Sequence, residues 1–232
     1  MSLDLNSIPS TSTKKDFGRM EDGTYGARIV SVIDLGIQHA KDWKTQKHQY
    51  HVLDEDGKWA KNGNDFLFTT EPTEAPDLKP QVMITFEFPT ERIEINDETK
   101  PRWMGKEYTL SANEKAGLVK LIAAVKPGTT KLGELINAPC FVSIGSTDKG
   151  KAKITGVSAP MKGVVVDDLE NPTTVFSLSD PKVEEWDKIP EFLKKKIKEA
   201  VNLKDTPAYS LVMAPSTQSE PVSTVDDDDI PF

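Results

Sequence analysis

The amino-acid sequence predicts a mainly β protein with helices. Apolar and polar residues alternate, as is typical of half-buried strands, in three segments, 24–37, 82–88 and 102–110. A helix is expected next, beginning at Ser111 and ending before Pro127. A hairpin of two strands follows, over 140–144 and 151–157. Three strands, a helix and two strands is the order of an OB-fold, a five-stranded Greek-key barrel.

The first strand is long and contains two glycines, Gly26 and Gly36. Glycine inside a strand often marks a bulge or a bend, so we expect the strand to curl at these points. Residues 38–79 interrupt the alternation and contain all three histidines. They are expected to form an enlarged loop after strand one, with a short hairpin that pairs 49–53 with 66–70.

The third strand is followed by a sequence signal for a helix start. Ser111 is the expected N-cap, and Glu114 three residues later completes a capping box. In the hairpin, Cys140, Val142 and Ile144 are expected to point into the core, which places Phe141 on the opposite face. A single cysteine excludes an internal disulfide.

The chain beyond residue 160 predicts a helical appendage. Apolar residues near helical spacing between 181 and 202 are interrupted by Pro190, so we expect two helical pieces that pack on the barrel. The predicted organisation is a flexible N-terminal arm (1–20), an OB-fold domain (21–160, with the insertion 38–79), a C-terminal extension (161–213) and a disordered acidic tail (214–232).

Charge is distributed unevenly along the chain. The net charge is −8, and residues 214–232 carry five acidic and no basic side chains, which leaves −3 for the rest. A mildly acidic body argues against bulk electrostatic binding of duplex DNA, which usually requires a basic domain. The sequence contains no apolar stretch long enough to span a bilayer and no secretory signal, so we expect no membrane partner and a cytoplasmic location.

The C-terminal tail ends in DDDDIPF, residues 226–232. A Ser-, Thr- and Pro-rich segment before it cannot bury enough apolar surface to fold, so the tail is expected to be a tether. An acidic run that ends in an apolar tip suits capture by a basic pocket with an apolar floor. The partner-binding residues expected here are Asp226, Asp227, Asp228, Asp229, Ile230, Pro231 and Phe232.

Cations alternate with aromatic rings in three parts of the chain, at 41–59, 100–108 and 141–153. Single-stranded DNA exposes phosphates and unstacked bases together, and proteins bind it with Lys or Arg beside exposed rings. Trp103 and Tyr108 are equally compatible with core packing. The residues expected to contact DNA are Arg28, Trp43, Lys44, Trp59, Phe68, Arg102, Trp103, Lys106, Tyr108, Phe141, Lys151 and Lys153.

The sequence shows no motif for catalysis or for a cofactor. It contains no Gly-rich phosphate loop, no G-x-S-x-G and no H-E-x-x-H. Three histidines with one distant cysteine do not make a zinc pattern. We therefore expect no catalytic residue, no metal site and no cofactor.

The tip resembles the C-terminus of bacterial single-stranded DNA-binding proteins. The opening DFGRMEDGTYGARIVSVIDLGIQ, the KPRW at 100–103 and EEWDKIPEFLKKKIKEAVN are similar to phage-encoded single-stranded DNA-binding proteins, such as those of the Enterobacter phage Enc group. The resemblance implies an OB-fold that coats and protects single strands in phage replication, recombination and repair. It also implies that the tip recruits replication and repair proteins. The insertion and the C-terminal helices depart from the bacterial pattern, so the resemblance does not extend to the oligomeric state.

Two other functions are compatible with the sequence. A metal-dependent nuclease that uses scattered Asp and Glu would degrade labelled oligonucleotide when Mg²⁺ is present. A protein-only adaptor with an OB-fold would not shift labelled poly-dT at low salt.

Overall fold

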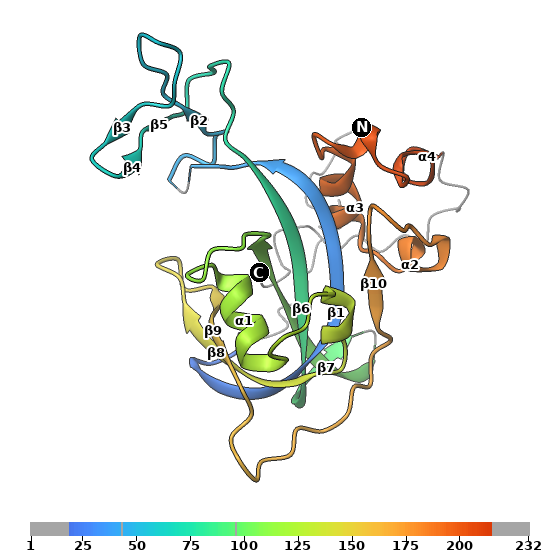
Figure 1. The fold of residues 1–232 in the computed structure, drawn as a ribbon. Coiled ribbons are helices and arrows are strands. Elements are labelled where there is room, and N and C mark those ends of the chain that lie inside the picture. The colour runs from blue at the N-terminus through green and yellow to red at the C-terminus, as the bar shows by residue number, and fades with distance from the viewer. Residues whose placement is uncertain (1–18, 43, 96, 215–232) are drawn as a thin grey trace, which may run out of the picture.

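The computed structural model describes residues 19–42, 44–95 and 97–214, so most of the N-terminal arm expected at 1–20 and of the acidic tail expected at 214–232 lies outside them. Met20, at the end of the expected arm, is described and is buried in the core, so a flexible arm does not extend to this residue. The body is mainly β, with one large antiparallel sheet and few helices (Figure 1). Five long strands follow the order β7-β6-β1-β8-β9. Their bounds are β1 Gly23–His39, β6 Leu78–Ile95, β7 Glu98–Thr109, β8 Pro139–Ser146 and β9 Ala152–Ser158.

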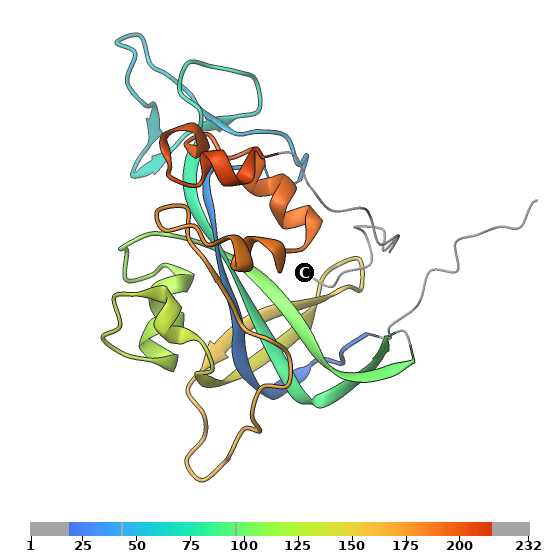
Figure 2. The ribbon, with the colours of Figure 1, turned by 90° about the vertical axis from the view of Figure 1, so that its right-hand side faces the viewer.

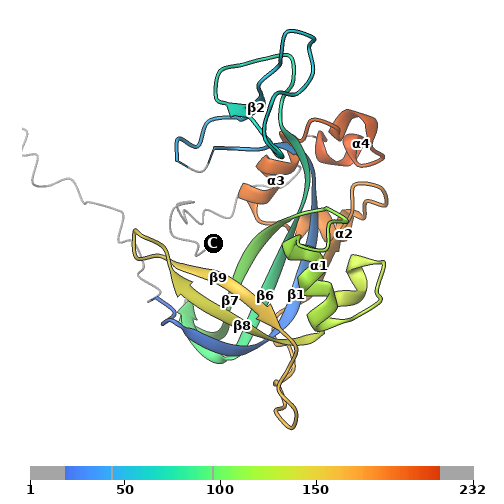
Figure 3. The same cartoon turned by 60° about the vertical axis from the view of Figure 1, so that its left-hand side comes forward.

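The sheet curls so that its two edge strands, β7 and β9, approach each other (Figure 3). No strand pairing joins them in the described part of the chain, and the sheet is therefore open at this seam. The first part of β1 pairs with β8 and the rest pairs with β6, which makes β1 the central strand. A sixth strand, β10 (Thr174–Phe176), runs parallel to β1 beside residues 31–33.

Strand β1 passes from one hydrophobic core to another. Its register with β6 shifts between Ile29 and Ser31 and again between Asp34 and Gly36. Ile29 packs in a core on the inner face of the curl, whereas Ile33 and Leu35 pack in a second core beneath the C-terminal helices. The bulge expected at Gly36 is present, and Gly36 has a φ of +72°.

The bulge expected at Gly26 is absent, and the strand shifts near Val30 instead. A glycine at position 26 has a different physical explanation. A Cβ built there would lie 3.3 Å from a methyl group of Val166, so the missing side chain makes room for the segment that follows β9.

The inner core is closed by helix α1 (Gly117–Val125), which contributes Leu118 and Leu121. The capping box expected at Ser111 is wrong. The helix begins five residues after the expected first position, and its N-cap, Ala116, makes no side-chain capping bond. Ser111 and Asn113 instead accept bonds from backbone N–H groups two residues further along, which favours turns over a helix start. A short 3-10 turn, η2 (Leu132–Leu135), leads into β8.

The C-terminal unit lies on the outer face of the sheet (Figure 2). It consists of α2 (Val183–Asp187), α3 (Glu191–Lys198), η3 (Leu203–Asp205) and α4 (Tyr209–Val212). The chain breaks between α2 and α3 at Pro190, as expected, and Trp186, Ile189, Leu193 and Ile197 are buried. Val201, which lies on the same sequence stripe, is exposed.

Residues 40–77 form an arm that projects from the far ends of β1 and β6 (Figure 1). The expected hairpin is present, because β2 (Tyr50–His51) pairs with β5 (Phe68–Thr69). A second pair joins β3 (Lys61–Asn62) to β4 (Asp65–Phe66). Among the described residues, no helix is long and apolar enough to cross a membrane.

Candidate nucleic-acid interface

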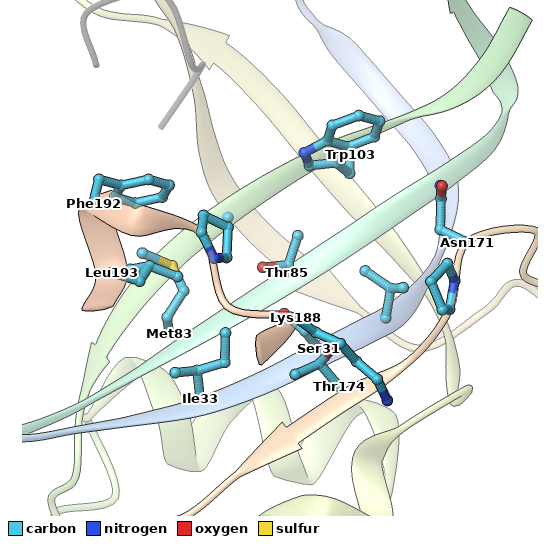
Figure 4. Close-up of a pocket in the computed structure, with 14 residues that line it drawn as sticks. Ser31, Ile33, Met83, Thr85, Trp103, Asn171, Thr174, Lys188, Phe192 and Leu193 are labelled. Carbon is cyan, nitrogen blue, oxygen red and sulfur yellow. The ribbon is translucent and has the colours of Figure 1, made fainter. Parts of the chain in front are cut away.

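A groove crosses the outer face of the sheet between the C-terminal unit and the seam of β7 and β9. It consists of two cavities, of about 360 Å³ and about 230 Å³, that share Met83 and Gly105 in their walls. The larger cavity lies under the C-terminal unit, and the smaller one reaches Lys153 and Ile154 of β9. Figure 4 shows the larger cavity, with Trp103 above the strands and Phe192 on the facing helix.

Strand pairing sets the floor of the larger cavity. Ser31 pairs with Thr85, and Thr85 pairs with Gly105, so these three residues form one row across β1, β6 and β7. Trp103 lies two residues before Gly105 on β7 and therefore points to the same face. The floor thus combines a flat ring with two small hydroxyl side chains.

Gly105 lies in the wall that the two cavities share. It lies inside a strand without a positive φ, so its backbone does not require glycine. A Cβ built there would lie 2.9 Å from the sulfur of Met83, the residue that also lines both cavities. Glycine inside a strand is typical of sites where another group approaches the backbone closely.

Carboxylates, of which Glu87 is buried, fix the wall that faces this floor. Glu87 on β6 is fully buried and accepts three hydrogen bonds, from the backbone N–H groups of Glu170 and Asn171 and from the Asn171 amide, at 2.7–3.1 Å. Both terminal nitrogens of Arg92 donate hydrogen bonds to the carboxylate of Glu170. Asp34 accepts a bond from the N–H of Leu178. The segment before the helices is therefore held rigidly against the sheet.

The smaller cavity is basic. Lys106 donates a hydrogen bond of 3.0 Å to the carbonyl oxygen of Ile154 and so links β7 to β9 across the open seam. Partial burial, with the nearby ammonium of Lys153, lowers the pKa of Lys106. Glu107 is paired with Lys196 of the C-terminal unit. Because the charge of Glu107 is balanced by Lys196, Lys106 and Lys153 give this end of the groove a positive character.

The charge of the groove lining differs in sign from that of the chain. Lys188 is the only ionisable residue that lines the larger cavity in the described part of the protein. The smaller cavity has Lys106 and Lys153 against Glu107. A protein with a net charge of −8 therefore has a groove whose lining is positive.

A second group of aromatic residues lies on the arm and is called the arm cluster here. The buried ring of His51 stacks on Trp59 at 3.8 Å between centroids, and Phe66 and Phe68 pack around it. Trp59 is 51% exposed, and the two phenylalanines are about 40% exposed. Lys61 lies 4.6 Å from the centroid of Phe66. The cluster thus offers exposed rings beside a cation, as Trp59 and Phe68 were expected to do.

The structure brings three of the expected DNA-contacting residues to the groove. Trp103 lines the larger cavity, and Lys106 and Lys153 line the smaller one. Arg102 is partly exposed, but as the residue before Trp103 on β7 it points to the opposite face of the sheet. Lys151 is exposed one residue before β9. Lys44 is exposed in the arm, apart from these residues, and Trp43 lies outside the described residues.

Three expected contacts occupy structural positions instead. Tyr108 and Phe141 are buried, with 6% and 7% exposure, so neither ring can stack on a base in this conformation. Phe141 is paired with Gly26, and the residue packed over Gly26, Val166, belongs to the segment that folds over this face. Alternation alone placed Phe141 outside, and it could not show that a later segment covers it.

Arg28 is the third residue with a structural position. Its guanidinium donates to the carbonyl oxygens of Asn137, Val166 and Asp167 and pairs with Asp168. These bonds tie the segment after β9 to β1 and leave little of the cation for phosphate.

Several residues of the groove were not found from the sequence, namely Met83, Gly105, Asn171, Lys188 and Phe192. Gly105 carried a usable signal, a glycine within a strand beside Trp103. Phe192 and Lys188 carried none, because their place depends on how the C-terminal unit docks.

The described residues contain no group of three or more His, Cys, Asp or Glu side chains that could hold a metal ion. His51 and Asp77 approach each other, with Nε2 and Oδ1 3.8 Å apart. Burial raises the pKa of Cys140 to about 12, so its thiol stays protonated at neutral pH. Comparison with known proteins gave no match among protein families, curated proteins or solved structures.

Proposed function

We propose that this protein binds single-stranded DNA without sequence preference, through the groove on the outer face of its sheet. The observation that carries the proposal is the lining of that groove. Trp103 supplies a stacking surface, and Lys106, Lys153 and Lys188 supply cations, on a chain that is otherwise acidic. Proteins that bind single strands combine these two elements, because stacking and phosphate contacts do not depend on base identity.

The strand order supports an OB-type fold for the body. The order β7-β6-β1-β8-β9, with α1 between β7 and β8, is that of a five-stranded Greek-key barrel opened between its third and fifth strands. In such barrels the ligand face spans the second and third strands, which here are β6 and β7. The groove lies on these strands, between the arm and the β8–β9 hairpin.

The arm cluster supplies a second set of rings for a longer strand. The acidic tip, residues 226–232, is proposed to recruit replication and repair proteins, in keeping with its charge and its apolar end. On this proposal the protein is a coating factor in phage DNA replication and recombination rather than an enzyme.

The test is a titration of the full-length protein with dT oligomers of increasing length, followed by tryptophan fluorescence at several salt concentrations. We expect quenching of tryptophan emission, and affinity that falls linearly in log K against log salt. Mg²⁺-dependent loss of the oligonucleotide would favour the nuclease instead. No quenching and no binding at low salt would favour the alternative of a protein-only adaptor.

A further inference from the structure

The larger cavity is a concave part of the groove with the volume of a small-ligand site. Its volume of about 360 Å³ lies at the lower end of the range of small-ligand sites, roughly 300–1,000 Å³. It is bordered on one side by the sheet and on the other by Asn171, in the segment before β10, and by Phe192 of the C-terminal unit (Figure 4). Pro190 of the C-terminal unit also lines it. This space suits a single planar group better than a run of stacked bases.

The walls offer both flat surfaces and hydrogen-bonding groups. Trp103 and Phe192 provide aromatic surfaces from opposite elements, β7 and α3. The hydroxyl groups of Ser31 and Thr85 make no side-chain hydrogen bond to any described residue. A hydroxyl can donate or accept, so it can pair with the edge of any base.

Asn171 adds an oriented acceptor. Its amide nitrogen donates a hydrogen bond of 2.7 Å to the carboxylate of Glu87, which holds the amide in place and leaves its carbonyl oxygen without a bond to Glu87. Glu87 itself is fully buried, and its oxygens accept bonds from the peptide that carries Asn171. The pocket is therefore preorganised on both walls.

We propose that this pocket receives one unpaired nucleobase of a bound strand, and that the C-terminal unit is the part of the protein that makes it. The base lies against Trp103 and Phe192, with its edge toward Ser31, Thr85 and Asn171. The pocket lining is apolar apart from these groups, Thr174 and Lys188, which suits a neutral ring attached to an anionic backbone. This inference rests on the proposed function and adds a discrete base site to it.

The test compares two ligands of equal length and charge, a dT oligomer and an abasic strand with the same phosphates. Phe192→Ala removes one wall, and Val201→Ala, in the same unit but exposed, is the matched control. Loss of one base stack corresponds to about five- to a hundred-fold in affinity. We expect Phe192→Ala to weaken dT binding by about that factor, to leave abasic binding within about twofold, and Val201→Ala to change neither.

A second measurement locates the base directly and does not depend on a variant. Strands that contain 5-iododeoxyuridine, irradiated with the wild-type protein, should cross-link to the peptides of Trp103 or Phe192, and excess dT should suppress this product. Two results would contradict the base pocket but not the proposed DNA binding. One is cross-linking confined to other aromatic residues, and the other is an equal loss of dT and abasic binding in Phe192→Ala. Absence of any dT binding by the wild type would overturn the proposed function and the pocket together.

Discussion

The groove on the sheet and the cluster on the arm contain the same kinds of side chain in different settings. In the groove, Trp103 lies on a paired strand and faces a wall that Glu87 and Asp34 hold in place. In the arm cluster, the rings pack mainly on one another around His51, on short strands of two residues each. A ligand that enters the groove meets a preformed site, whereas the arm offers a surface.

The two regions also differ in charge. Residues 40–77 contain five lysines against eight Asp or Glu, which gives −3. Lys61 lies over the ring of Phe66, and Lys79 is paired with Asp77 at 2.8 Å. The groove, by contrast, has three lysines and one acid in its lining, and that acid is paired. Both regions therefore place cations near rings, but only the groove lining has more cations than acids, which is the balance that phosphate favours.

The largest expected effect is on folding stability, and it concerns the wall of the groove, which has no counterpart in the arm. Glu87→Ala would leave three donors of residues 170 and 171 without a partner, each at a cost of about 1–3 kcal/mol if it stays buried. We expect a loss of about 3 kcal/mol or more in the free energy of unfolding, measured by urea denaturation, together with weaker DNA binding. Glu94→Ala, exposed on the same strand, is the control. An unchanged urea midpoint would show that Glu87 does not anchor the wall.

The next effect compares one tryptophan from each region. Trp103→Ala should weaken binding of a dT oligomer by about tenfold or more, because it removes a stacking surface beside cations. Trp59→Ala should cost less, about two- to threefold, because one face of Trp59 already stacks on His51 and the arm is acidic. Fluorescence anisotropy of a labelled oligomer measures both. A larger loss in Trp59→Ala would make the arm the principal site.

A smaller effect concerns the cations. Lys153→Ala should lower the slope of log K against log salt by about 0.7, the value for one phosphate contact on a single strand. Lys61→Ala should leave the slope unchanged, since its ammonium lies over a ring of the arm. Binding isotherms at four or more salt concentrations give the two slopes. Equal slopes in Lys153→Ala and the wild type would show that Lys153 does not contact a phosphate of the bound strand.

The sequence was sufficient to predict features that depend on the alternation of apolar and polar residues and on the order of the elements. The alternating run at 82–88 placed Phe86 and Phe88 in the core, where both are fully buried, and Pro190 marked the break between two helices. Trp103 was found as a ring beside cations, although core packing was an equal alternative. These features depend on residues close together in the chain.

Features that depend on contacts between distant segments could not be predicted. Phe141 has the alternation of an outward residue, but the segment that contains Val166 folds over its face of the sheet. Arg28 is an exposed cation by pattern, yet it binds carbonyl groups more than a hundred residues away. The larger cavity is lined by Trp103 of β7 and Phe192 of α3, and the sequence around either residue gives no sign that they line the same cavity.

The smallest effect tests the seam at which the groove ends. Burial and Lys153 lower the pKa of Lys106 in the folded protein, so the unfolded chain, with an ordinary lysine pKa of about 10.4, binds this proton more tightly. Folding stability therefore rises with pH as the proton leaves, through the interval between the lowered and the ordinary value.

The substitution Lys106→Met removes this contribution, whereas Lys149→Met, at an exposed position in the turn between β8 and β9, is the control. We expect the free energy of unfolding of the Lys106→Met variant to rise less steeply than that of the wild type as the pH approaches the ordinary lysine pKa from below, measured by urea denaturation at each pH. Parallel curves would mean that the Lys106 ammonium is fully hydrated in the folded protein. The hydrogen bond to Ile154 would then not hold β7 and β9 together, and the basic end of the groove would be free to widen around a strand.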